Sequence, residues 1–265
     1  MGPHLPDWLP TPARRDYLEA RAAVDDYINA IIDDRRGQPD PGANDLLTRL
    51  MGARDADGSA MGASLLRDES ITMFFAGHET TARTMTATWA ALATNPEVAA
   101  RLHGELDSAL GEREPTVDDL KRLPYTLQVV KEVLRLWPAA PFYVRDAVEP
   151  VDLLGTRLEP GTPVMLAPYW THRHPDFWDD PERFDPDRFT REAEAARHPQ
   201  AYHPFATGER VCVGNHFSLL ESHLLVATLG RRFSSRLAPG HQPVWAMGGT
   251  LSPVGGMPML FERRR

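Results

Sequence analysis

The uneven distribution of proline is the feature that most constrains how this chain of 265 residues can fold. Residues 43–95 contain no proline, whereas eleven of the 24 prolines lie between Pro138 and Pro204. A proline inside a helix removes a backbone donor and clashes with the preceding turn, which costs about 3 kcal/mol. The first window therefore has room for a long helix over about residues 62–94. The second must consist mostly of short strands, turns and loops.

Apolar residues that recur at intervals of three or four indicate several further helices. Thr11-Pro12 can start one of them, because threonine caps a helix N-terminus and proline fits its first turn. The pattern predicts helices over about residues 12–37, 45–51, 96–110, 125–137 and 215–227. The best candidate strands are residues 142–145, 163–167 and 259–261, with Leu251 in another. We therefore predict a mainly α fold with a small β component, in a single domain over residues 1–265.

Composition excludes several classes of protein. The net charge of -8 argues against general binding to nucleic acid. Residues 1–7 have neither a basic start nor an apolar stretch, so we expect no signal peptide, and no apolar run approaches the length of a membrane span. A single cysteine rules out an intrachain disulfide and fits a reducing compartment. The expected location is the cytoplasm.

The lone cysteine, Cys212, stands in the segment Phe-Ala-Thr-Gly-Glu-Arg-Val-Cys-Val-Gly that begins at Phe205. A single cysteine is most often a small buried apolar residue. Here Gly208 and Gly214 bracket it, and glycine permits backbone geometries closed to other residues. A predicted helix follows, and the dipole at its N-terminus favours a thiolate at Cys212. The segment is therefore a candidate ligand loop with room for a flat cofactor.

The spacing Phe-x-x-Gly-x-Arg-x-Cys-x-Gly resembles the haem-binding signature of the cytochrome P-450 family at each defined position, from Phe205 to Gly214. The resemblance implies that Cys212 is the axial thiolate ligand of haem b, iron protoporphyrin IX. It also implies that Arg210 pairs with a haem propionate and that Phe205 packs beside the sulfur. Arg145 falls where the family has a second propionate-binding arginine; the alternative is a charge at an exposed strand end.

The middle of the long predicted helix has an unusual composition. Seven threonines lie within residues 72–94, and Gly77 in the helix interior costs about 1 kcal/mol relative to alanine. Glu79 lies among apolar neighbours, and one interpretation is an amphipathic helix whose polar stripe carries it. The run Ala-Gly-His-Glu-Thr-Thr from Ala76 also resembles the distal-helix motif of the same family. That resemblance implies that Ala76 and Gly77 open the helix beside the haem iron, and that Glu79 and Thr80 deliver protons.

A Glu-x-x-Arg pair stands in the helix predicted before Trp137. Glu132 and Arg135 share a helix face and can pair, although such a pair alone is typically a surface salt bridge worth under about 1 kcal/mol. The longer run Glu-x-x-Arg-Leu-x-Pro-x-x-Pro resembles the family's structural pair, which a further arginine completes into a buried network. Arg183 and Arg188 compete for that role. The longer family frame, Trp-x-x-Pro-x-x-Phe-x-Pro-x-Arg-Phe, favours Arg188.

The resemblance as a whole implies a cytochrome P-450 fold truncated at its N-terminal side, with the chain supplying the C-terminal half to two-thirds of a complete member. Its loop-rich meander would cover about residues 170–204. The implied activity is that of a haem-thiolate monooxygenase, which inserts one oxygen atom from dioxygen into a small hydrophobic organic substrate. Electrons would come from an external ferredoxin- or flavodoxin-type donor. The alternatives are a peroxide-driven peroxygenase, against which Glu79 and Thr80 argue, and a truncated, catalytically impaired haem-binding fragment.

Basic residues gather near the cysteine loop in the sequence. They are Arg210, His216, Arg231 and Arg232. Because the chain is acidic overall, we expect an acidic electron donor to dock on the Cys212 side. The alternative is that these side chains are only solvated surface charges.

Overall fold

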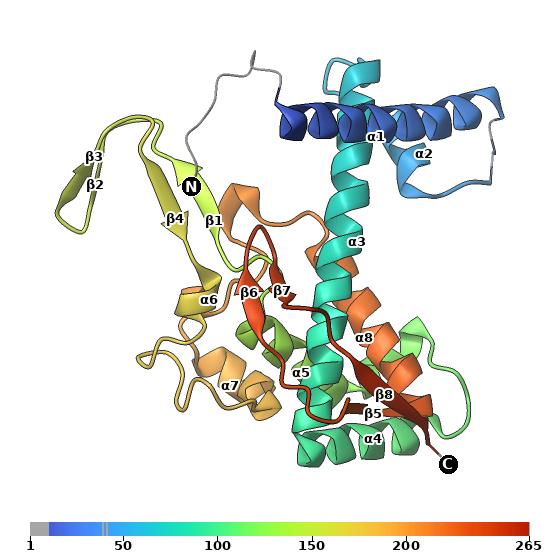
Figure 1. Cartoon of the computed structure of the whole chain (residues 1–265), viewed down its shortest axis with the longest axis vertical. Helices are drawn as coiled ribbons and strands as arrows, with labels where there is room; N and C mark the ends of the chain where they lie inside the picture. Colours follow the sequence, from blue (N-terminus) through green and yellow to red (C-terminus); the bar gives the residue numbers. More distant parts are fainter. Residues whose placement is uncertain (1–10, 39, 41, 265) are drawn as a thin grey trace. The chain divides into compact units, whose positions relative to one another are not determined.

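The computed structural model describes residues 11–38, 40 and 42–264 (Figure 1). The chain divides into two compact units, residues 1–78 and 79–265, and the boundary falls inside the long helix α3, Ala63–Thr94. The hydroxyls of Thr72, Thr84 and Thr88 each donate to the carbonyl four residues earlier in α3, at 2.8–3.0 Å. These hydroxyls thus have partners within their own helix, although threonine is only a moderate helix former.

The first unit contains two helices before α3, which are α1 Pro12–Gly37 and α2 Leu46–Gly52. Thr11 caps α1, since its hydroxyl accepts a hydrogen bond from the Arg14 backbone N–H at 3.2 Å. Asp45 caps α2 in the same way, at 2.9 Å. The predicted start of α1 at Pro12 is confirmed. The buried apolar residues that α1 and α3 share are Ile28, Ile32 and Leu66.

The second unit packs its helices around one apolar core (Figure 1). The elements that contribute to it are the second half of α3, α4 Pro96–Leu110, the 3-10 helix η1 Val117–Arg122, α5 Pro124–Leu136 and α8 Asn215–Arg232. Leu102, Leu106 and Val226 are fully buried within it. Gly230 lets α8 approach α4 closely, because a Cβ there would lie 3.1 Å from Leu106 Cδ1 and 3.2 Å from Leu102 Cδ2.

Eight short strands form four antiparallel pairs among the described residues. The pairs are β1 Tyr143–Asp146 with β4 Pro163–Leu166, β2 Val151–Leu153 with β3 Thr156–Leu158, β5 Phe233–Leu237 with β8 Met259–Arg263, and β6 Trp245–Met247 with β7 Leu251–Pro253. The strands predicted at β1, β4, β7 and β8 are confirmed. Sequence analysis missed the other four strands, which are only three to five residues long. In Figure 1 the β2–β3 hairpin projects away from the helices of its unit.

Between β4 and α8 the chain is built from short helical turns. These are α6 Pro168–Thr171, η2 Pro186–Phe189, α7 Arg191–Ala196, η3 Pro199–Ala201 and η4 Gly208–Arg210. A small second core forms there from Trp178, Phe189 and Ala201. The predicted mainly α fold with a small β component is confirmed. None of the helices in the described part of the chain is long and apolar enough to cross a membrane.

Candidate functional site

The cysteine loop is closed by a backbone hydrogen bond. The Cys212 N–H donates to the Phe205 carbonyl at 2.9 Å, which bends the intervening residues into a loop. The Asn215 N–H donates to the Cys212 carbonyl at 3.3 Å, and α8 begins at Asn215. Cys212 is exposed and lies two residues before Gly214, the N-cap of α8. The loop therefore holds the thiol outside the core, where a ligand can reach it.

The two glycines of the loop have different roles. Gly208 has a φ of +71°, in the left-handed region that strains other residues. Gly214 has a φ of -87°, which any residue adopts, so the expectation of a special backbone geometry there is wrong. A Cβ at Gly214 would lie 3.9 Å from Cys212 Sγ, an ordinary contact, and glycine leaves that space open. Ala206 has the second positive φ of the loop, +60°, which sequence analysis missed.

Apolar side chains lie exposed on both sides of Cys212 in the sequence. Val211, Val213 and Phe217 are 45%, 79% and 66% exposed. A concentration of exposed apolar residues marks a surface that a ligand or a partner covers. Among the described residues, no group of three His, Cys, Asp or Glu side chains could hold a metal ion. A single thiol beside apolar residues and a glycine fits a haem, whose iron needs only an axial ligand from the loop.

Phe205, Arg210 and Arg145 are the other side chains of the second unit that we expect around a haem. Phe205 packs against the main core and is half-buried. Arg210 is exposed in η4. The guanidinium carbon of Arg145 lies 4.9 Å from the Tyr143 ring centroid, and its Nη1 donates to the Val144 carbonyl at 2.8 Å. Both arginines thus keep their charge at or near the surface, where an anionic group can approach.

Glu79 lies on an exposed part of α3. Its carboxylate is 47% exposed, and its Oε1 accepts hydrogen bonds from Arg83 Nη2 at 3.2 Å and from Thr250 Oγ1 at 2.9 Å. Arg83 is four residues along the same helix, a spacing at which opposite charges attract. Thr80 is half-buried, and its carbonyl accepts from Thr84 Oγ1 at 3.0 Å. The acid and the adjacent alcohol therefore both lie in the second unit, on one turn of α3.

Ala76 and Gly77 belong to the part of α3 that lies in the first unit. Both are exposed. A Cβ built on Gly77 would meet no atom within 4 Å among the described residues outside its own helix backbone. Packing within this chain therefore gives no reason for glycine at position 77, and the space beside the helix is open there.

The Glu-x-x-Arg pair forms the centre of a buried polar network. Glu132 and Arg135 have no exposed side-chain surface, and Arg135 donates to both carboxylate oxygens at 2.7 Å. Arg135 also donates to the carbonyls of His172 at 2.8 Å, Pro181 at 2.7 Å and Arg183 at 3.0 Å. Burial raises the pKa of Glu132, and the hydrogen bonds from Arg135 oppose that shift. The pair thus ties α5 to the loop-rich segment after α6.

Of the two competing arginines, only Arg188 directs its side chain at the pair. Arg188 Nε lies 3.6 Å from Glu132 Oε1, and its side chain is 12% exposed. The Asp185 backbone N–H donates to the same oxygen at 2.8 Å. Arg183 contributes its backbone carbonyl to Arg135, and the residue itself is exposed. The geometry therefore favours the frame that ends in Arg188.

A buried histidine lies beside this network, and no role was predicted for it from the sequence. The His203 backbone N–H donates to His172 Nε2 at 2.9 Å. The neutral ring consequently carries its proton on Nδ1, which lies 3.2 Å from the Arg135 carbonyl and donates to it. Burial is the main cause that lowers the pKa of His172 to about 3, and the neighbouring His203 is the next largest. His172 thus fixes the backbone at the end of α5.

The basic pair at the end of α8 is partly neutralised. Arg231 and Arg232 both form ion pairs with Glu114, and Arg231 Nη1 also donates to the Glu112 carbonyl at 2.8 Å. The Arg231 side chain is only 14% exposed. Proximity in the sequence therefore overstated the free positive charge at this end of the helix.

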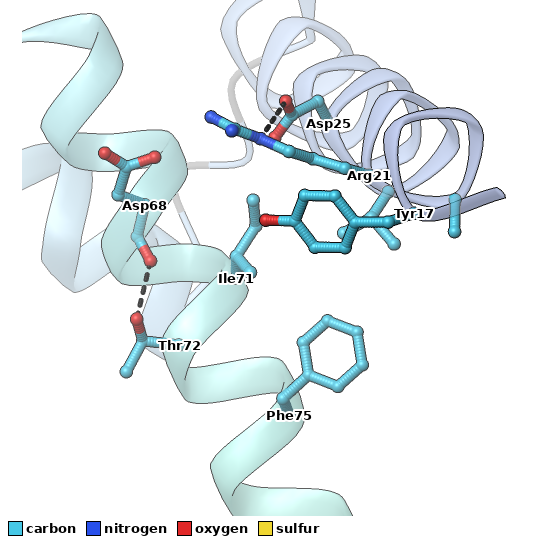
Figure 2. Close-up of a pocket in the computed structure, with 9 residues that line it drawn as sticks. Tyr17, Arg21, Asp25, Asp68, Ile71, Thr72 and Phe75 are labelled. Atoms are coloured by element: carbon cyan, nitrogen blue, oxygen red, sulfur yellow. Dashed lines mark hydrogen bonds and ion pairs between the residues drawn. The ribbon is translucent and has the colours of Figure 1, made fainter. Parts of the chain in front are cut away.

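The first unit contains a groove between α1 and α3 (Figure 2). Tyr17 reaches from α1 toward Ile71 and Phe75 on α3, as Figure 2 shows. Above them, Arg21 and Asp25 form an ion pair of 3.8 Å on α1. The groove thus combines apolar walls with a charged rim, a composition that suits a small apolar ligand.

Comparison with known proteins gives consistent matches. The family model described as cytochrome P-450 matches residues 1–255. Cyclooctatin synthase of Streptomyces melanosporofaciens is 37% identical over 233 residues, which are 88% of this chain and 51% of that protein. Pentalenene oxygenase of Streptomyces avermitilis is 37% identical over 227 residues, which are 86% of this chain and 50% of that protein.

Solved structures agree with these matches. The retinoic acid-bound cyanobacterial CYP120A1 has a TM-score of 0.91 and 30% sequence identity, over 98% of this chain and 60% of that one. The chain therefore spans between one half and three fifths of these relatives.

Proposed function

Because the chain belongs to the cytochrome P-450 family, we propose that it forms the C-terminal part of a haem-thiolate monooxygenase, with Cys212 as the axial ligand of haem b. A haem bound through a thiolate supplies the chemistry that inserts one atom of dioxygen into an organic substrate. The observation that carries the proposal is the cysteine loop, in which an exposed thiol lies between apolar side chains at the start of α8.

The residues of the loop would hold the cofactor in distinct ways. Cys212 supplies the sulfur ligand, and Gly214 leaves space beside it. Arg210 in η4 and Arg145 on β1 offer guanidinium groups to the two propionates, a charge-assisted contact about twice as strong as a neutral hydrogen bond. Phe205 closes the loop through its carbonyl and packs behind it against the core.

Proton supply is the proposed role of Glu79 and Thr80. The Glu79 carboxylate is 47% exposed, so it can exchange protons with water. Thr80, the next residue, carries a hydroxyl that both donates and accepts hydrogen bonds, so it can pass a proton onward to oxygen held in the site. Ala76 and Gly77, one turn earlier on α3, present small side chains and leave room beside the helix.

The proposed substrate is a small hydrophobic organic molecule, the class of substrate that membership of the family implies. The proposed electron donor is an external ferredoxin- or flavodoxin-type protein. The proposed location is the cytoplasm, which agrees with the single cysteine of the chain. The names of the oxygenase and synthase relatives describe those proteins, and they support oxidative chemistry on organic molecules here.

Carbon monoxide difference spectroscopy tests the ligand assignment directly. We expect the reduced, carbon monoxide-bound chain to show the red-shifted Soret band of a thiolate-ligated haem. Cys212→His should lose that band while retaining some haem, because imidazole also binds iron. Retention of the band in Cys212→Ala would show that the thiolate ligand is not Cys212.

A further inference from the structure

A hairpin distant in the sequence contacts the Glu79 carboxylate. Thr250 lies in the turn between β6 and β7, 171 residues after Glu79, and its hydroxyl donates to Glu79 Oε1 at 2.9 Å. Arg83 Nη2 reaches the same oxygen from α3 at 3.2 Å. The carboxylate is therefore contacted both from its own helix and from a separate element.

The hairpin that carries Thr250 is fixed to the core of the second unit. The Leu251 N–H donates to the Ala139 carbonyl at 3.0 Å, and Leu251 is only 3% exposed. On the paired strand, the Trp245 ring lies 5.9 Å from the Trp137 ring. Because its neighbour in the chain is buried and bonded, Thr250 presents its hydroxyl from a defined position.

The helical partner alone is a weak restraint on the glutamate. Arg83 and Glu79 form an i,i+4 pair with side chains 34% and 47% exposed. Such pairs on a helix surface contribute little, and a glutamate side chain has several rotamers available in a helix. A donor from a fixed element therefore restricts the rotamers that Glu79 can adopt.

We propose that Thr250 is a positioning residue for Glu79, so that the β6–β7 hairpin sets the orientation of the acid that supplies protons. The role of Glu79 in proton supply rests on the proposed function, whereas the contact between Thr250 and Glu79 is independent of that function. Ser252 Oγ lies 3.3 Å from Thr250 Oγ1 and supports the same hydroxyl from within the hairpin.

Hydrogen exchange on the purified chain tests the contact without any need for turnover. Thr250→Val removes the hydroxyl and keeps the side-chain shape, whereas Thr250→Ser keeps the hydroxyl. We expect the amides of residues 248–251 to exchange about three- to tenfold faster in Thr250→Val, the factor that corresponds to one lost hydrogen bond. Thr250→Ser should exchange at the parent rate.

The same measurement in a Glu79→Ala background identifies the partner. There Thr250→Val should cause no further acceleration, because the acceptor of the hydroxyl is already gone. An equal acceleration in both backgrounds would mean that the hydroxyl acts through another group, and this would overturn the proposal. Unchanged exchange in Thr250→Val alone would overturn it as well.

A second readout tests the consequence for proton supply in the haem-loaded chain. Dioxygen that takes up two electrons and two protons without oxidising substrate leaves as hydrogen peroxide. We expect Thr250→Val to release a several-fold larger share of its electrons as peroxide. Thr250→Ser should stay near the parent. An unchanged share in Thr250→Val would overturn the positioning role. Failure of the proposed function can be told apart from failure of the positioning role, because the parent itself would then lack the Soret band of a thiolate-ligated haem.

Discussion

Removing Arg135 should be among the most destabilising single changes in this chain. Its guanidinium has no exposed surface and donates to both oxygens of Glu132 and to three backbone carbonyls. Arg135→Ala would leave a buried carboxylate and buried carbonyls without their donor. Stranding one partner of a buried ion pair costs about 3–5 kcal/mol, a large share of the roughly 5–15 kcal/mol that stabilises a typical domain.

The two other arginines near this network provide graded comparisons. Arg188 Nε lies 3.6 Å from Glu132 Oε1, and its second guanidinium nitrogen, Nη2, donates to the Asp180 carbonyl at 2.8 Å. Without Arg188, Glu132 would still have Arg135 and the Asp185 N–H as partners, so Arg188→Ala should cost about 1–2 kcal/mol. Arg183 is exposed and contributes only its backbone carbonyl, which alanine also has. Arg183→Ala should therefore change the free energy of unfolding by less than about 0.5 kcal/mol.

Urea denaturation followed by circular dichroism measures all three variants on the chain without cofactor. With a slope of about 2 kcal/mol per molar urea, the midpoint should fall by about 2 M in Arg135→Ala and by about 0.5–1 M in Arg188→Ala. Arg135→Lys keeps the charge but not the planar fork, so it should remain strongly destabilised. The reasoning fails if Arg183→Ala loses as much stability as Arg188→Ala, or if Arg135→Lys denatures like the parent.

Two further predictions concern pH and proton delivery. The pKa of His172 in the folded chain is about 3, below the usual 6.5, because the ring is buried. Between pH 3 and pH 6.5 this histidine is therefore protonated in the unfolded chain and neutral in the folded one. The free energy of unfolding should therefore fall by about 1.4 kcal/mol per pH unit as the pH drops from 6.5 toward 3, and urea titrations of His172→Gln should show a shallower slope. In the haem-loaded chain, Thr80→Ala should lower the yield of product per electron and raise peroxide release, measured against Thr80→Ser. Equal yields in Thr80→Ala and the parent would remove the hydroxyl from proton delivery.

Sequence analysis succeeded where the signal is local. The capping pair Thr11-Pro12 sets the start of α1, and the absence of proline over residues 43–95 allows α3 to run unbroken through Gly77. Threonine is only a moderate helix former, yet the threonines of α3 lie within a continuous helix and bond to carbonyls of the preceding turn. Each of these features depends on residues within one or two turns of one another, which is the range over which sequence patterns carry information.

Contacts between distant segments were beyond prediction. Nothing in the sequence around Glu79 indicates that its carboxylate accepts a hydrogen bond from Thr250, 171 residues away. Similarly, the left-handed backbone at Ala206 depends on the closure of the loop, and alanine gives no warning of it. The choice between Arg183 and Arg188 needed a family frame, because both follow the same local pattern of acid, arginine and phenylalanine.

The second unit combines a buried core with exposed apolar side chains along α8. Leu102, Leu106 and Val226 are fully buried, and the Glu132–Arg135 pair has no exposed surface. Along α8, by contrast, Phe217 and Leu220 are 66% and 40% exposed. Burial of such side chains contributes roughly 1.5–3 kcal/mol each when complete, so this surface still has stabilisation to gain from a covering group. A group that covers this surface would therefore add to the stability of the unit, to which the buried Glu132–Arg135 network makes its own contribution.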